Sequence, residues 1–140
     1  MARLEVFELL RSRYAEVAQL YAECGYRQGL TARDHVFAAT RDGVLIGVVR
    51  LCPEHGTAVL RGMQVRPAHQ RSGVGSLLLD TCVAALGDAV CYCLPWRSLE
   101  TFYGRGGFRR LALTEAPPFL RDRCTTYRAA GHDAIVTRRP

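Results

Sequence analysis

The stretch from residue 57 to residue 86 constrains the fold of this 140-residue chain more than any other. Residues 57–65 are rich in β-forming side chains and stop just before Pro67, which predicts a strand. A helix is predicted to follow and to end at Gly87, because apolar side chains recur at helical spacing at Val74, Leu77, Leu78, Cys82 and Leu86. The loop between strand and helix holds Gly73 and Gly75. This arrangement presents free backbone N–H groups at the positive end of a helix, where an anion such as phosphate binds.

The glycine pair by itself leaves two interpretations open, a phosphate-binding loop and a tight turn. It is not a P-loop, because no Gly-Lys-Ser/Thr follows, and it lacks the third glycine of a dinucleotide-binding fingerprint. The surrounding charge favours an anionic ligand. No Asp or Glu occurs between Glu54 and Asp80, whereas Arg61, Arg66 and Arg71 do. A solvated basic face is the alternative explanation of that charge.

The length and composition indicate one globular domain. A chain of 140 residues is long enough for a single buried core. No apolar run approaches the roughly 18 residues that a membrane span needs, and Glu5 and Glu8 interrupt the apolar N-terminus, which is not typical of a signal peptide. We therefore expect a cytoplasmic protein that has no membrane partner.

The six cysteines are expected to be reduced thiols that pack as small apolar side chains. Cys91-x-Cys93 places both sulfurs on one face of a predicted strand, and no second Cys or His pair stands at zinc spacing. A metal site is therefore not expected.

The remaining elements predict a mixed α/β fold. Asp42-Gly43 between two β-rich runs is a strong hairpin signal, because both turn residues tolerate positive φ. The strand after the helix should run parallel to the strand before it, since a crossover connects them. Residues 4–10 are predicted to begin as a strand and to pass into a helix. The other predicted strands are residues 36–40, 44–51, 57–65, 89–94, 108–113 and 134–137. The predicted helices are residues 12–23, 74–86, 99–103 and 117–130, and residues 27–34 read as a turn or a further short helix.

Two motifs in this order resemble one enzyme family. Gln70-x-x-Gly73-x-Gly75 resembles the Q/R-x-x-G-x-G/A signature of the GNAT (Gcn5-related) N-acetyltransferases, and residues 102–108, Phe-Tyr-Gly-Arg-Gly-Gly-Phe, resemble their F-Y-x-x-x-G-F element. The elements between the motifs also follow the family's order. The resemblance implies one GNAT domain over residues 1–140, with the acyl-CoA N-acyltransferase fold: a mixed, mostly antiparallel sheet with flanking helices and a splayed pair of strands 4 and 5.

The resemblance also implies a chemistry, the transfer of acetyl from acetyl-CoA to a primary amine. The main chain of Met63 and Val65 would pair with the pantetheine arm, and Tyr103 would protonate the departing thiolate as general acid. The alternative interpretation of Tyr103 is a core aromatic residue that packs beside Phe102. The pyrophosphate would lie on the loop that carries Gln70, Arg71, Ser72, Gly73, Val74, Gly75 and Ser76.

The sequence departs from the family pattern at two positions. Arg61 stands where many members have a glutamate that acts as base through water, and Arg61 cannot accept a proton at neutral pH. Trp96 stands where many members have an asparagine that contacts the coenzyme. By position alone, Glu54 and His55 are candidates for the base, with His69 third. Each of the three is otherwise an ordinary loop residue.

Two other function classes stay open at this level. A module that binds acetyl-CoA for regulation, without turnover, is consistent with the missing glutamate. Nucleic-acid binding is disfavoured, because the 19 arginines show neither aromatic–basic interleaving nor zinc-finger spacing. As partners we expect acetyl-CoA and a small-molecule or peptide amine, whose pocket residues 24–35 and 114–125 would shape. The motifs leave a homodimer open.

Overall fold

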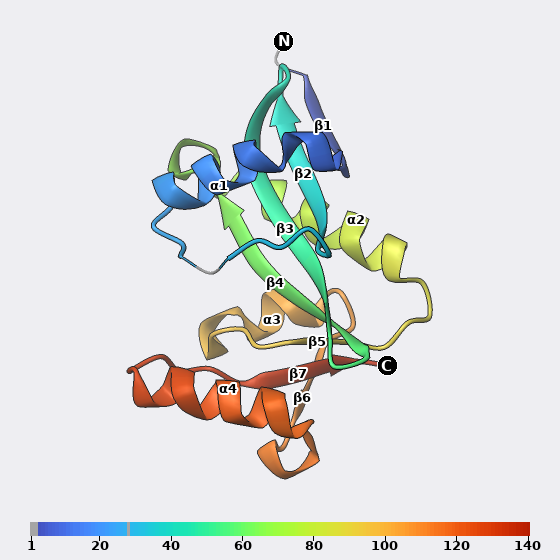
Figure 1. The fold of residues 1–140 in the computed structure, drawn as a ribbon, viewed down its shortest axis with the longest axis vertical. Helices are drawn as coiled ribbons and strands as arrows, with labels where there is room; N and C mark the ends of the chain where they lie inside the picture. The colour runs from blue at the N-terminus through green and yellow to red at the C-terminus, as the bar shows by residue number, and fades with distance from the viewer. Residues whose placement is uncertain (1–2, 28) are drawn as a thin grey trace.

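Residues 3–27 and 29–140, which the computed structural model describes, form a seven-stranded sheet with the strand order β1-β2-β3-β4-β5-β7-β6. Neighbouring strands are antiparallel except for the parallel pair of β4 and β5. This is the predicted fold class (Figure 1). The strands are β1 Leu4–Glu8, β2 His35–Arg41, β3 Val44–Glu54, β4 Thr57–Val65, β5 Cys91–Cys93, β6 Arg109–Leu111 and β7 Val136–Arg139.

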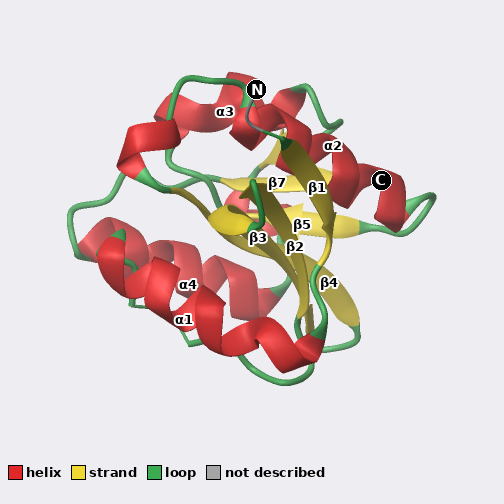
Figure 2. Ribbon diagram, turned by 90° about the horizontal axis from the view of Figure 1, so that it is seen from above, coloured by secondary structure: helices red, strands yellow, loops and turns green. Residues whose placement is uncertain are grey.

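Helices cover both faces of the sheet (Figure 2). They are α1 Tyr14–Glu23, α2 Val74–Leu86, α3 Glu100–Gly104 and α4 Pro118–Ala129. Figure 2 shows α1 and α4 on one face and α2 and α3 on the other. Side chains alternate along β2 accordingly: Phe37 belongs to the core under α2, and Val36 to the core under α1. Both faces of the central strands are therefore buried.

Local sequence signals explain several boundaries. Asp42 and Gly43 have φ of 51° and 83°, as the hairpin signal requires. Pro118 begins α4, where its missing N–H costs no hydrogen bond. The described residues of 27–34 contain a turn and no helix, and Gln28 lies outside the described residues. The last strand begins at Val136, two residues later than predicted, because Ala134 forms an isolated bridge with Trp96 and the Ile135 amide donates to Pro95.

All six cysteines are free thiols, and all except Cys24 are buried. Cys82, Cys91 and Cys93 pack together in the core beneath α2, which confirms their role as small apolar side chains. Within residues 3–27 and 29–140, no three His, Cys, Asp or Glu side chains gather where they would hold a metal ion. None of the helices in this part of the chain is long and apolar enough to traverse a bilayer.

Candidate active site

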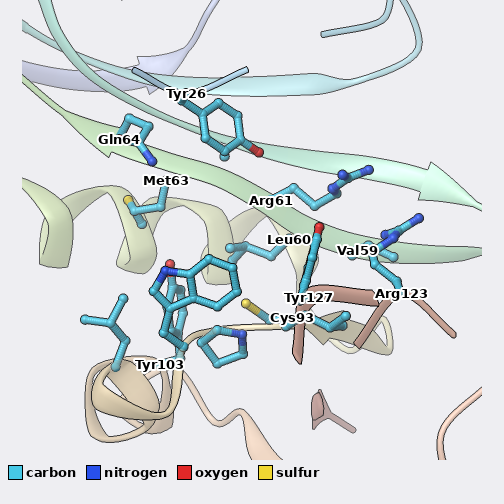
Figure 3. Close-up of a pocket in the computed structure, with 15 residues that line it drawn as sticks. Tyr26, Val59, Leu60, Arg61, Met63, Gln64, Cys93, Tyr103, Arg123 and Tyr127 are labelled. Carbon is cyan, nitrogen blue, oxygen red and sulfur yellow. The ribbon is translucent and has the colours of Figure 1, made fainter. Parts of the chain in front are cut away.

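The site begins where β4 and β5 separate. Ala58 to Leu60 pair with Cys91 to Cys93, and beyond Leu60 no described strand pairs with this edge of β4. A cavity of about 180 Å³ opens between the diverging strands (Figure 3). It is lined by residues from β4, from the segment after β5 and from the flanking helices: Tyr26, Val59, Leu60, Arg61, Gly62, Met63, Gln64, Cys93, Leu94, Pro95, Trp96, Leu99, Tyr103, Arg123 and Tyr127.

A β-bulge at Gly62 shapes this part of β4. Arg50 of β3 pairs with Arg61 and Val48 pairs with Gln64, so that Gly62 and Met63 together oppose one residue of β3. Gly62 has φ of +66°, and its carbonyl oxygen accepts a hydrogen bond of 2.8 Å from the Tyr21 hydroxyl. Such a bulge bends the strand and increases its twist. The bend occurs where β4 leaves β5 and the cavity opens.

Gly62→Ala is expected to destabilise the fold and to disturb the cavity. A Cβ at this position would lie 2.2 Å from the Tyr21 hydroxyl oxygen, and the left-handed backbone strains any side chain. Strain and overpacking together are expected to lower the free energy of unfolding by about 2–3 kcal/mol. Urea denaturation checks this value. Gly43→Ala has a similarly positive φ but open space around its Cβ and serves as the control for backbone strain alone.

A buried arginine anchors the chain segment that contains the cavity residue Tyr26. The Arg50 side chain is 1% exposed and donates to the Asp34 carboxylate at 2.8 Å. It also donates to the Gly29 carbonyl oxygen at 2.9 Å and to the Tyr26 hydroxyl at 3.3 Å. Because these partners lie in the connection between α1 and β2, Arg50 anchors that connection to β3.

The loop of residues 70–76 leads into α2, and it is called the coenzyme loop below after the role that the motif predicts for it. Arg71 and Gly73 have φ of 61° and 84°, and Gly73 is the N-cap of α2 without a side-chain cap. Among the described residues, no acceptor is seen for the backbone amides of residues 71–76. Gln70 ties the loop to β4, because its side-chain amide donates to the Val65 carbonyl oxygen at 3.0 Å. The free amides at a helix N-terminus form a binding site for an anion.

A cleft of about 210 Å³ lies over these amides, lined by Val65, His69, Gln70, Arg71, Gly73, Gly75, Ser76 and Phe102. Val65 belongs to β4, so the cleft meets the end of the strand whose preceding residues line the cavity. Arg105 lies beside the same helix start, with its guanidinium 3.4 Å from the Ser76 hydroxyl. The cleft over the loop and the cavity are therefore connected by the open edge of one strand.

Tyr103 on α3 contributes a phenol to the cavity. Its ring packs edge-on against Phe102 and Phe108, with ring centroids 4.9 Å and 6.3 Å away. Within the part of the chain that the structure describes, its hydroxyl has no hydrogen-bond partner. Burial raises the pKa of Tyr103 well above its ordinary value, so the phenol keeps its proton at neutral pH.

Comparison with protein-family models establishes the family of this chain. Residues 32–110 match the model of the acetyltransferase (GNAT) domain, which is more than half of the chain. The chain belongs to the GNAT acetyltransferase family. It is therefore an acyltransferase, as the two motifs predicted. A comparison with curated protein sequences gives no match.

Solved structures show that other proteins share this fold. The ribosomal-protein-S18-alanine N-acetyltransferase of Escherichia coli has a TM-score of 0.73 at 17% identity, over 99% of this chain and 94% of that one. An acyl-CoA N-acyltransferase of Pseudomonas aeruginosa has 0.71 at 21% identity, over the whole of both chains. The N-acetylglutamate synthase of Neisseria gonorrhoeae, in complex with coenzyme A and N-acetyl-glutamate, has 0.69 at 20% identity, over 99% of this chain and 35% of that one.

The structure of this GNAT protein places the candidate bases away from Tyr103. Glu54 accepts hydrogen bonds from Arg123 at 2.5 Å and 3.2 Å and from Arg61 at 3.4 Å. Burial alone would raise the pKa of Glu54, but the two arginines outweigh it and hold the pKa below its ordinary value. The His55 ring lies tilted against the Phe119 ring, with ring centroids 4.2 Å apart. Neither Glu54 nor His55 lines the cavity, and His69 lies in the cleft over the coenzyme loop.

Several cavity residues carried no motif in the sequence. Tyr26 comes from the connection between α1 and β2, and Arg123 and Tyr127 come from α4. Trp96 stacks on His132 at 4.6 Å and meets the Tyr127 ring edge-on at 5.5 Å, which joins the segment after β5 to α4. Tyr26 and Arg123 fall within residues 24–35 and 114–125, which were expected to shape the acceptor pocket, but no motif singled out the individual side chains.

Proposed function

We propose that this GNAT enzyme, as one domain over residues 1–140, transfers acetyl from acetyl-CoA to a primary amine of a small molecule or peptide. One observation carries the proposal. The unpaired amides of the coenzyme loop and the cavity that holds Tyr103 lie along one open edge of β4. A long ligand with an anionic middle and a reactive end would follow this edge from the loop into the cavity.

The residues present fit coenzyme A. In the proposal, the amides of residues 71–76 hold the pyrophosphate, and Gly73 and Gly75 allow it to approach the main chain. The main chain of Met63 and Val65 pairs with the pantetheine arm as an added strand would. Gln70 contributes by holding the coenzyme loop against Val65. Acetyl-CoA supplies the activated acyl group.

In the proposed reaction, the amine nitrogen attacks the thioester carbonyl carbon, so that a C–N bond forms and the C–S bond breaks. Tyr103 donates its proton to the departing thiolate. The raised pKa of Tyr103 suits this role, because the proton is present throughout the neutral range. The proton that the amine loses leaves through water and restores the phenol, so the products are the acetylated amine and the free thiol.

Within the described part of the chain, the cavity lining offers no carboxylate base. Arg61 and Arg123 line the cavity, and no acidic side chain does so among the described residues. In the proposal, the amine therefore enters from solution in its neutral form, which is in equilibrium with the ammonium ion. Glu54 and His55 remain predictions for a base that acts through water.

A thiol-release screen tests the proposal. Wild-type protein is incubated with acetyl-CoA and a panel of amino acids, polyamines, aminoglycosides and peptide N-termini, and the acetylated amine is quantified by mass spectrometry. We expect one acetylated amine for each thiol released. Heat stabilisation by acetyl-CoA without thiol release from any amine would instead support a coenzyme-binding module without turnover.

A further inference from the structure

The acceptor end of the cavity is positively charged. Two guanidinium groups, Arg61 on β4 and Arg123 on α4, line it. Glu54 does not line it and lies 2.5 Å from Arg123 and 3.4 Å from Arg61. Two positive charges and one negative charge leave a formal surplus of one positive charge. All three side chains are largely shielded from solvent, with exposed fractions between 18% and 23%, so this surplus is screened less than it would be on the surface.

The charged groups and the phenol occupy different parts of the cavity. In Figure 3, Arg61 and Arg123 lie toward one end with the Tyr127 hydroxyl near them, and Tyr103 lies toward the other end. The Tyr26 hydroxyl also points into the cavity from the opposite wall. A ligand that fills the cavity therefore meets hydrogen-bond donors and positive charge at one end and the reaction centre at the other.

We propose that the acceptor is a small amine that carries a carboxylate, which binds at the Arg61 end while its amine faces Tyr103. This inference rests on the proposed acetyl transfer. A guanidinium group offers a planar pair of N–H donors that matches a carboxylate. The bound carboxylate offsets the surplus positive charge. A polyamine would instead bring further positive charge against both arginines, which disfavours its binding.

The size of the cavity also favours a small acceptor. Its volume of about 180 Å³ is below the range of roughly 300–1,000 Å³ that is common for pockets of drug-sized ligands. The acetyl group must share this space. The part of the acceptor that enters the cavity beside the acetyl group is therefore small, as a free amino acid or a short ω-amino acid is.

The test compares each acid with its own amide. Glycine, β-alanine and 4-aminobutanoate are assayed beside glycinamide, β-alaninamide and 4-aminobutanamide, with kcat/KM expressed per neutral amine. We expect at least one acid to exceed its amide roughly 10- to 100-fold, the usual effect of one hydrogen-bonded charge. Arg61→Gln should remove most of this preference by raising KM for the acid and leaving the amide nearly unchanged. Arg61→Glu should shift the preference toward spermidine.

Arg121→Gln is the matched control, because Arg121 lies on α4 near Arg123 but does not line the cavity. The ratio of kcat/KM for an acid to kcat/KM for its amide should be the same in Arg121→Gln as in wild type. Equal rates for acids and amides, a preference for spermidine in wild type, or an equal effect of Arg61→Gln on acids and amides would overturn the inference.

If no amine releases thiol, the proposed transfer fails and binding alone decides the inference. Protein saturated with coenzyme A is then titrated calorimetrically with the same acids and amides. Heat seen with an acid, absent with its amide and lost in Arg61→Gln supports a carboxylate site. Absence of binding, or equal binding of acid and amide, overturns it.

Discussion

Tyr103→Phe is expected to reduce turnover about 100-fold while leaving coenzyme affinity and melting temperature near those of wild type. The phenol lines the cavity and makes no hydrogen bond to the described residues, so its removal breaks no internal bond. The ring still packs on Phe102 and Phe108. General acid catalysis typically contributes about 10²–10⁴-fold, and the lower limit already gives the expected loss. Steady-state kinetics and a thermal melt check the two parts.

Tyr92→Phe provides the matched control for Tyr103→Phe. Tyr92 lies on β5 and packs under α4, away from the cavity, and the structure shows no hydrogen bond from its hydroxyl to a described residue. The turnover of the Tyr92→Phe variant should equal that of wild type. The pH profile of wild-type turnover should also show no decline from ionisation of Tyr103 below pH 10, because burial raises the pKa of this phenol. A fully active, stably folded Tyr103→Phe variant would rule out the general-acid role.

Asp34→Asn is expected to lower the free energy of unfolding by about 3–5 kcal/mol, the range seen when one partner of a buried ion pair is removed. Asp34 and Arg50 are both almost fully buried, and the carboxylate is the charge that faces the Arg50 guanidinium at 2.8 Å. Without it, a positive charge stays buried without compensation. Urea denaturation at neutral pH measures the loss. Asp122→Asn, an exposed carboxylate on α4, should change stability little.

The Asp34 carboxylate should also make the free energy of unfolding depend on pH. Burial alone would raise the pKa of Asp34, but the Thr31 amide and Arg50 outweigh it and hold the pKa below its ordinary value. The folded state therefore binds fewer protons than the unfolded state. The stabilisation is complete well above the unfolded pKa of about 3.9 and is lost as the pH falls through the folded value. Asp34→Asn should lack this contribution.

A paired replacement keeps the Asp34 prediction testable if Asp34→Asn does not fold. Arg50→Met combined with Asp34→Leu removes both charges, and it should recover much of the stability that the single change loses. Wild-type stability in Asp34→Asn would show that the ion pair does not hold the connection between α1 and β2.

Local sequence signals predicted the parts of the fold that depend on neighbouring residues. The Asp42-Gly43 hairpin, the glycine N-cap of α2 and the parallel crossover of β4, α2 and β5 all follow from turn chemistry and periodicity. The insertion of β7 between β5 and β6 had no local signal, because strand order depends on contacts between residues far apart in the chain.

Arg50 shows why the cavity itself was harder to predict. In the sequence, it is one arginine within the apolar run of residues 44–52, and no motif includes it. In the structure, it is buried, because Tyr21, Tyr26 and Asp34 converge on it from 16 to 29 positions away. Tyr26 and Arg123 reach the cavity through the same kind of distant contact. The roles that the motifs gave to residues 70–76 and Tyr103 stay predictions. Residues 24–35 and 114–125 were expected to shape the acceptor pocket, but no local signal singled out Tyr26 or Arg123 within them.

The most direct test of the account is a calorimetric titration of coenzyme A into wild-type protein, Gly75→Ala and Gly75→Asp. A Cβ at Gly75 would lie 3.6 Å from the Phe102 ring, an ordinary contact, and a carboxylate suits the first turn of a helix, so both variants should fold. We expect one binding site in wild type and at least tenfold weaker binding in Gly75→Asp, because the carboxylate repels the pyrophosphate. A tenfold loss corresponds to the loss of about one charge-assisted hydrogen bond. Undiminished affinity in a folded Gly75→Asp variant would contradict coenzyme binding at the N-terminus of α2.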